Sequence, residues 1–229
     1  MSISINYFKI YGLMRTGTNY ISTILLNNFL DTNVFMNVGG WKHGRLIEYP
    51  DSFELVKNVD INTKNNIKID KIIDLFMNNY VNFIVIIKNP YMWIKSMSIY
   101  KKQEITSLFV IEYITIWNYI YSNYKNYIEN GRAYLIKYEE LLEKPSETLD
   151  KIKNKFNMTP KNHNYIFEKN TLLPNGDYNI GKIKNLIFDK NKYINPNISN
   201  YLSNDIIRII NENIDISLMK FYDYKLAIV

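Results

Sequence analysis

Apolar and polar positions along the chain predict two strand–loop–helix units built on the same plan. The first starts with a short apolar strand at residues 8–10, turns sharply, and continues into a helix whose apolar positions recur with helical spacing up to residue 28. The second starts with the run 82–87, which is almost continuously apolar and β-branched, as in a central parallel strand buried on both faces. A helix with Pro90 in its first turn follows. Because ligands of open α/β sheets bind where such strands end, we expect the site at that edge.

The remaining pattern predicts an α/β fold with a central, mostly parallel sheet. Further strands are expected at residues 33–36 and 132–137, and further helices at residues 69–80, 105–130, 145–156, 202–213 and around Leu218. The polar segment 51–66 and the Asn-, Lys-, Gly- and Pro-rich segment 157–200 are expected to be mostly irregular. A chain of 229 residues is long enough for one such domain with a substantial core, so we expect residues 1–229 to form a single three-layer α/β/α domain.

The turn between the first strand and its helix carries residues suited to binding an anion. Gly12 and Gly17 let the backbone turn sharply and approach a ligand, and the amides at the helix start point toward whatever anion lies there. Arg15 adds a permanent positive charge, while Thr16 and Thr18 add hydroxyl donors. The turn therefore predicts a phosphate or sulfate site, the alternative being a glycine turn with nothing bound.

The spacing from Gly12 to Gly17 is that of a Walker A loop, but the residues that follow are not those of that motif. Thr18 and Asn19 stand where the motif has lysine and a serine or threonine. The loop thus lacks the lysine that reaches the β- and γ-phosphates and the usual magnesium ligand. ATP chemistry is disfavoured, whereas anion binding is not.

Composition excludes several classes of site and partner. The chain has no cysteine, which rules out disulfides, zinc–thiolate sites and cysteine nucleophiles, and its two histidines are too few for a histidine-rich metal site. The net charge of +6 is spread over the chain without a compact basic run, so we expect no specific nucleic-acid binding. The longest apolar run, 83–87, is far too short to span a bilayer. We expect a soluble, cytoplasmic protein that does not bind a membrane.

Three short segments, taken together, resemble a known family. The first is Arg-Thr-Gly-Thr-Asn-Tyr at residues 15–20, between a strand and a helix. The second is Lys-Asn-Pro at residues 88–90, after a strand, with Ser96 eight residues beyond Lys88. The third is Tyr-Glu-Glu-Leu at residues 138–141, after a strand and before a proline that starts a helix. In order and spacing they resemble the sulfotransferases that use 3′-phosphoadenosine 5′-phosphosulfate (PAPS), over about residues 8–156.

The resemblance implies a P-loop-NTPase-like sulfotransferase fold and a PAPS site without a metal. It implies that the loop from Arg15 to Thr18 holds the 5′-phosphosulfate and that Lys88 and Ser96 grip the 3′-phosphate. It also implies that Tyr20 and Tyr138 contact adenine. The implied cofactor residues are Arg15, Thr16, Gly17, Thr18, Asn19, Tyr20, Lys88, Ser96, Tyr138 and, beside Gly181, Lys182. Lys88 replaces the arginine commoner in the family, which keeps the charge and loses the bidentate geometry.

Sulfuryl transfer by in-line displacement also needs a charge stabiliser and a base. Arg15 can stabilise charge on the leaving oxygen, and Lys42 can contact the sulfuryl oxygens. The neighbouring His43 is the best candidate for the base, because its ordinary pKa near 6.5 suits proton abstraction. Glu48 is its rival, since some family members use a glutamate, and a lone histidine in a loop is often a bystander.

We expect a small-molecule or glycan acceptor that is modified at a hydroxyl or amine, but no pattern of the sequence identifies it. The segments expected to select it, 37–66 and 157–200, carry the least pattern, although Trp41, Tyr49 and Trp93 could line a sugar or aromatic acceptor site. Core packing explains Trp93 equally well. A P-loop small-molecule kinase and a catalytically inactive nucleotide-binding module, or a nucleic-acid binder exploiting the charge, remain the alternative functions.

Overall fold

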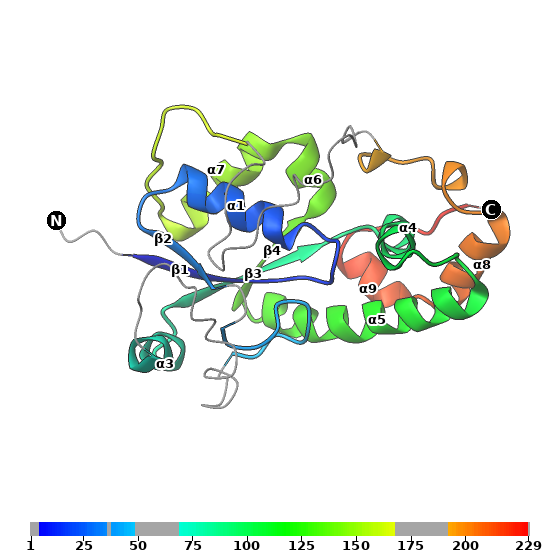
Figure 1. Ribbon diagram of the computed structural model, residues 1–229, viewed down its shortest axis with the longest axis horizontal. Coiled ribbons are helices and arrows are strands. Elements are labelled where there is room, and N and C mark those ends of the chain that lie inside the picture. The colour runs from blue at the N-terminus through cyan, green and yellow to red at the C-terminus, as the bar shows by residue number, and fades with distance from the viewer. Residues whose placement is uncertain (1–4, 36–37, 49–68, 168–191, 229) are drawn as a thin grey trace.

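The computed structural model describes residues 5–35, 38–48, 69–167 and 192–228 (Figure 1). Its centre is a parallel sheet in the order β2-β1-β3-β4. The strands are β1 (Asn6–Tyr11), β2 (Thr32–Phe35), β3 (Val81–Ile87) and β4 (Ala133–Lys137). All three neighbouring pairs are parallel, with Ile10 opposite Ile84 and Ile84 opposite Tyr134. The carboxyl ends of β1, β3 and β4 therefore lie at one edge of the sheet.

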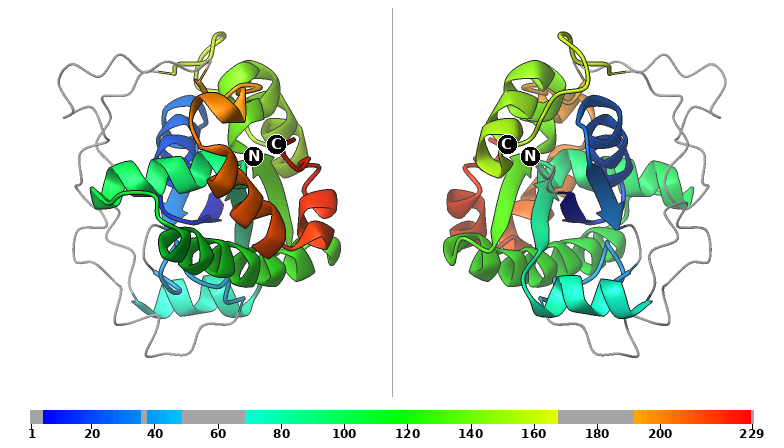
Figure 2. Two further views of the ribbon diagram at one scale, coloured as in Figure 1. Left: turned by 90° about the vertical axis from the view of Figure 1, so that its right-hand side faces the viewer. Right: turned by 90° about the vertical axis from the view of Figure 1, so that its left-hand side faces the viewer.

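Helices cover both faces of this sheet, which makes three layers (Figures 1 and 2). On one face lie α1 (Thr18–Asn28), α6 (Tyr138–Glu143) and α7 (Pro145–Phe156). The other helices are α3 (Ile69–Met77), α4 (Pro90–Lys101), α5 (Ser107–Glu129), α8 (Asn204–Asn213) and α9 (Ile216–Phe221). Their buried residues join one core with the second face of the sheet. The predicted three-layer α/β/α fold is confirmed.

Strand β3 shows why the sheet is covered on both faces. Ile84 and Ile86 point into the core beneath α1, α6 and α7, whereas Phe83, Val85 and Ile87 point into the opposite core. All five are at most 2% exposed. A continuous apolar run is what a strand with two buried faces requires, and the sequence prediction for this strand holds within one residue.

Several helix boundaries lie at or near their predicted positions, because the residues that cap these helices directly precede or follow them in the sequence. Asn89 accepts hydrogen bonds from the backbone amides of Tyr91 and Met92 at the start of α4, with Pro90 in the first helical turn. Thr106 caps α5, and Gly131 follows its end with φ of +69°. The helix predicted to run to residue 80 ends at Met77, and the one predicted to begin at residue 202 begins at Asn204.

The Tyr-Glu-Glu-Leu segment forms a short helix of its own, α6, which the periodicity did not predict. In segment 157–200, only 157–167 and 192–200 are described; they contain turns, one isolated bridge and a 3-10 turn at Ile198–Asn200, as expected for an irregular segment. Lys182 and Tyr49 lie outside the described residues.

Candidate functional site

The loop between β1 and α1 is a tight turn held by its own hydrogen bonds. The carbonyl of Leu13 accepts from the backbone amide of Thr16 at 3.2 Å and from its hydroxyl at 2.6 Å. Arg15 and Gly17 both take left-handed backbone angles, with φ of +68° and +94°. The Thr16 hydroxyl donates its proton within the loop, to Leu13. The predicted contact of Thr16 with a cofactor stays a prediction.

Helix α1 begins at this loop without a side-chain cap. Gly17 is its N-cap residue and has no side chain that could accept a hydrogen bond from the first-turn amides. These amides and the helix dipole favour an anion at this end of the helix. Arg15 lies exposed beside it, with its guanidinium carbon 5.5 Å from the centre of the Tyr100 ring. These features favour an anion at this loop, and the predicted binding of the phosphosulfate there stays a prediction.

Tyr138, at the end of β4, packs directly against this loop. A Cβ on Gly17 would lie 2.7 Å from Cδ2 and 2.8 Å from Cε2 of Tyr138, so only glycine fits. The phenol is buried, which raises its pKa. The first and third sequence segments are therefore in contact.

Lys88, at the end of β3, joins the second segment to the other two. Its ammonium donates to the Ser96 hydroxyl at 2.8 Å and to the Arg15 carbonyl at 3.4 Å. It also lies 4.7 Å from the ring centre of Tyr138 and 4.1 Å from that of Tyr193. The structure therefore brings together the predicted residues Arg15, Gly17, Lys88, Ser96 and Tyr138.

The Lys88 side chain is only 2% exposed, and this burial lowers its pKa to about 7. The negative charge of Glu139 opposes the shift, while the positive charges of Arg15 and Lys192 reinforce it. The hydrogen bonds from the Lys88 ammonium to neutral oxygens replace only part of the hydration energy that burial removes. An anionic group placed beside Lys88 would supply more of it and would therefore be bound favourably.

Two residues of this region were missed by the sequence analysis. Glu139 accepts a hydrogen bond from the Asn89 amide and another from the Tyr224 hydroxyl, both at 2.8 Å, and burial raises the pKa of its carboxyl. It therefore holds the junction between β3 and α4. Tyr193 packs edge-on against Tyr138, with ring centres 5.6 Å apart. Glu139 lies inside the Tyr-Glu-Glu-Leu segment, so the sequence contained a motif from which its role could have been predicted. Tyr193 lies in no recognisable motif.

The predicted base, His43, lies against the same loop. The carbonyl of Gly12 is 2.6 Å from His43 Nδ1, and the amide of Gly12 donates to the carbonyl of Lys42 at 3.0 Å. Because a carbonyl can only accept, Nδ1 carries the ring proton and Nε2 carries the lone pair. Burial, reinforced by the charges of Lys42 and Lys9, lowers the pKa of His43 to about 4, although the bond to Gly12 opposes this. The imidazole is therefore neutral at pH 7, but a pKa of about 4 makes it a weaker base than the ordinary value near 6.5, on which the prediction of its role rested.

Lys42 and Asn19, both predicted site residues, contact each other. The Lys42 ammonium donates to the Asn19 side-chain carbonyl, which joins the loop after β2 to the first turn of α1. Tyr20, in the same turn, is partly buried against the core beneath α1, which raises its pKa. Its predicted contact with adenine stays a prediction.

Glu48 and Trp93 are placed away from the roles considered for them. Glu48 forms an ion pair with Arg132, which precedes β4 and also bonds Asn79, just before β3. It therefore lies at the amino-terminal edge of the sheet, opposite the edge of Lys88. Trp93 is 1% exposed and donates from its indole nitrogen to the Met14 carbonyl at 2.7 Å. It supports the loop from the core and does not line an acceptor site.

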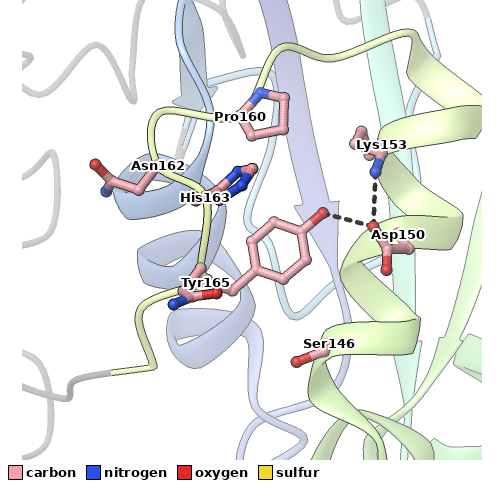
Figure 3. A pocket seen from close by; sticks show the side chains of 8 residues that line it. Ser146, Asp150, Lys153, Pro160, Asn162, His163 and Tyr165 are labelled. Atoms are coloured by element: carbon pink, nitrogen blue, oxygen red, sulfur yellow. Dashed lines mark hydrogen bonds and ion pairs between the residues drawn. The ribbon is translucent and has the colours of Figure 1, made fainter.

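A surface cavity of about 650 Å³ lies between α7 and the segment after it (Figure 3). Tyr165 and Lys153 both donate to the Asp150 carboxylate there, at 2.8 and 2.7 Å, and His163 lies in its wall. None of the described residues predicted to bind a cofactor lines it.

Comparison with solved structures identifies the fold of this chain. The sulfotransferase domain of the curacin biosynthetic pathway superimposes with a TM-score of 0.52 at 12% identity, covering 99% of this chain and 100% of that one. Mouse sulfotransferase SULT7A1, solved in complex with PAP, also gives a TM-score of 0.52, at 13% identity, covering 97% and 90% of the two chains. The chain has a sulfotransferase fold. No protein-family model and no curated protein sequence matches it.

The sulfotransferase fold of this chain is thus recognisable from its three-dimensional arrangement and not from overall sequence similarity. Within the described ranges, no helix is both long and apolar enough to cross a membrane. In the same ranges, no three acidic, histidine or cysteine side chains gather as a metal site would require.

Proposed function

We propose that this protein transfers a sulfuryl group from PAPS to a hydroxyl or amine of an acceptor by in-line displacement. The observation that carries the proposal is the convergence of three separate sequence segments at one edge of the sheet. Lys88 contacts Arg15 and Tyr138, and Tyr138 contacts Gly17. The sulfotransferase fold supports the same assignment.

The donor groups of this edge fit a ligand with two separate anionic groups. The uncapped start of α1 and the Arg15 guanidinium suit the 5′-phosphosulfate. The buried ammonium of Lys88, bonded to Ser96, suits a 3′-phosphate, since an anion would compensate its lost hydration. PAPS, when bound, supplies the sulfuryl group and a stable leaving group, adenosine 3′,5′-bisphosphate.

In this proposal, His43 acts as the base. Nε2 of the neutral imidazole takes the acceptor's proton while the acceptor oxygen or nitrogen bonds to sulfur and the bond from sulfur to the bridging oxygen breaks. Arg15 and the first-turn amides of α1 stabilise the charge that develops on the leaving oxygen. Lys42 is positioned beside α1 by Asn19, where it can contact the sulfuryl oxygens.

A thermal-shift titration with adenosine 3′,5′-bisphosphate, beside ADP and Mg-ATP, tests this function. At about 100 times its dissociation constant, a ligand adds roughly 2.7 kcal/mol to stability, which raises the melting temperature by about 5 to 10 °C for a chain of this size. We expect this shift with the bisphosphate and much smaller shifts with the other nucleotides. A preference for Mg-ATP would contradict the proposal and favour a kinase, and no shift with any nucleotide would also contradict it.

Arg15→Gly is the matched variant for this titration. Arg15 has φ of +68°, which costs a non-glycine residue roughly 1–2 kcal/mol, and glycine relieves this strain while adding about 0.4–1 kcal/mol of unfolded-state entropy. The free variant should therefore melt close to wild type. Its shift with the bisphosphate should be strongly reduced, and an undiminished shift would remove Arg15 from the site.

A further inference from the structure

Trp41 is the exposed tryptophan of this chain, and it lies beside His43. The sequence contains three tryptophans, of which Trp93 and Trp117 are at most 1% exposed, whereas Trp41 is 56% exposed. Its ring meets the imidazole of His43 edge-on, with ring centres 5.3 Å apart and planes at 87°. An exposed indole next to the proposed base offers a ligand a flat face on which to stack.

Polar side chains of β1 and α5 donate hydrogen bonds to the backbone of the loop that carries Trp41. Buried Lys9 and Tyr11, both from β1, donate to the carbonyls of Gly40 and Gly39 at 2.7 and 2.8 Å. Tyr124 of α5 donates to the carbonyl of Gly44 at 2.6 Å. The amide of Gly44 in turn donates to the carbonyl of Trp41 at 2.9 Å. These hydrogen bonds attach the backbone on both sides of Trp41 to β1 and α5, and the same loop carries His43.

The half-exposed position and polar surroundings of the ring discriminate between classes of acceptor. A flat apolar acceptor would leave much of its surface in water here, whereas apolar ligands usually bind in pockets that enclose them. A sugar ring has one face of C–H groups that can stack on indole and a rim of hydroxyls that water satisfies. Lys42, His43 and the exposed Arg45, whose guanidinium carbon lies 5.8 Å from the Tyr119 ring centre, supply polar groups along the same loop.

We propose that Trp41 is the acceptor platform of this protein and that the acceptor is a carbohydrate, whose sugar ring stacks on the indole and presents a hydroxyl to His43. This inference rests on the proposed function for the identity of the reaction. The binding of a sugar at Trp41 can nevertheless be measured without any transfer, so the two can fail separately.

Iodide quenching of tryptophan fluorescence isolates Trp41, because the other two indoles are buried. We would titrate the full chain, saturated with adenosine 3′,5′-bisphosphate, with cellobiose, lactose and N,N′-diacetylchitobiose, and separately with phenol and 1-octanol. The same protein would be applied to an array of immobilised glycans. We expect at least one glycan to bind and to lower iodide quenching severalfold. Absence of any glycan effect, or protection by phenol or octanol alone, would overturn the proposal.

Trp41→Phe and Trp41→Ala provide the controls. Both variants should keep the melting shift with the bisphosphate, which shows that the fold and the nucleotide site are intact. Trp41→Ala should lose glycan binding on the array, and Trp41→Phe should recover part of it, because a phenyl ring still offers a stacking face. Unchanged glycan binding in Trp41→Ala would place the sugar elsewhere and overturn the proposal. Loss of the bisphosphate shift in wild type would instead count against the proposed function.

Discussion

At the scale of single residues, Lys88 is the most informative group. It is an amine buried to 2% exposure with a pKa lowered to about 7 by that burial, and its partners come from all three sequence segments and from Tyr193. Desolvated cations of this kind are commoner at binding sites than elsewhere. If Lys88 grips a phosphate, its protonation state controls the affinity.

The affinity for adenosine 3′,5′-bisphosphate should therefore depend on pH above neutrality. As the pH rises through about 7, free Lys88 loses its proton, so the dissociation constant should rise by up to ~tenfold per pH unit. Lys88→Arg should show little change between pH 7 and pH 9, because a guanidinium stays protonated. Calorimetric titrations at several pH values measure this. Identical pH dependence in the two proteins would exclude Lys88 as the titrating contact.

The lowered pKa of His43 predicts that the free energy of unfolding depends on pH. Its folded-state pKa of about 4 lies below the ordinary 6.5, so between these values the unfolded chain binds a proton that the folded chain does not. The contribution of His43 to stability is present above pH 6.5 and is lost as the pH falls through this window. Urea unfolding of wild type and of His43→Asn, which can retain a donor to Gly12, measures it. The variant should lose less stability on acidification, and parallel losses would show that His43 is not buried in its neutral form.

The sequence predicted the site residues that directly follow a strand. It did not predict those that reach the site from distant parts of the chain. Arg15, Lys88 and Tyr138 each follow a recognisable strand, so the rule that parallel strands end at one edge was sufficient to bring them together. Tyr193 belongs to no helix or strand, and Tyr224 reaches Glu139 from 85 residues away. Contacts of that kind depend on packing of the complete chain, which local patterns do not encode.

At the scale of elements, the junction between β1 and α1 depends on the contact between Gly17 and Tyr138. A methyl group at Gly17 would meet the Tyr138 ring at 2.7 Å, in addition to the strain of a positive φ. At Gly131 the φ is also positive, +69°, but nothing lies within 4 Å of the added Cβ. The two positions therefore separate backbone strain from steric overlap.

Gly17→Ala should destabilise the protein more than Gly131→Ala. The strain of a left-handed backbone costs each variant roughly 1–2 kcal/mol, and overlap with a buried ring adds about 1–3 kcal/mol for Gly17→Ala alone. Denaturant unfolding compares them, and Tyr138→Ala combined with Gly17→Ala should recover part of the difference. Equal losses for the two alanine variants would show that Tyr138 does not close the loop.

Elements with strong local signals were predicted best. The apolar run of β3, the proline at the start of α4 and the glycine after α5 mark their elements within a residue or two. Helix α6 has only six residues, and its two leucines are too few to establish a helical period, so its prediction required tertiary contacts.

At the scale of the whole molecule, the parallel sheet brings three distant segments to one edge, while α8 and α9 complete the core on the face opposite α1 (Figure 1). Tyr224, after α9, donates to Glu139 and so connects the end of the described chain to the junction of β3 and α4. The chain has a sulfotransferase fold at only 12–13% identity to the solved structures, so the order of apolar positions and the packing of the core maintain the fold without similar sequences.

The central claim is that Lys88 recognises a 3′-phosphate, and calorimetry with adenosine 3′,5′-bisphosphate and adenosine 5′-monophosphate tests it most directly. Wild type should bind the bisphosphate about 10- to 100-fold more tightly, since a charged hydrogen bond contributes roughly 1.5–3 kcal/mol. Lys88→Ala should bind both nucleotides with similar affinity. If wild type does not discriminate between them, or if Lys88→Ala discriminates as well as wild type does, the assignment of this site is wrong.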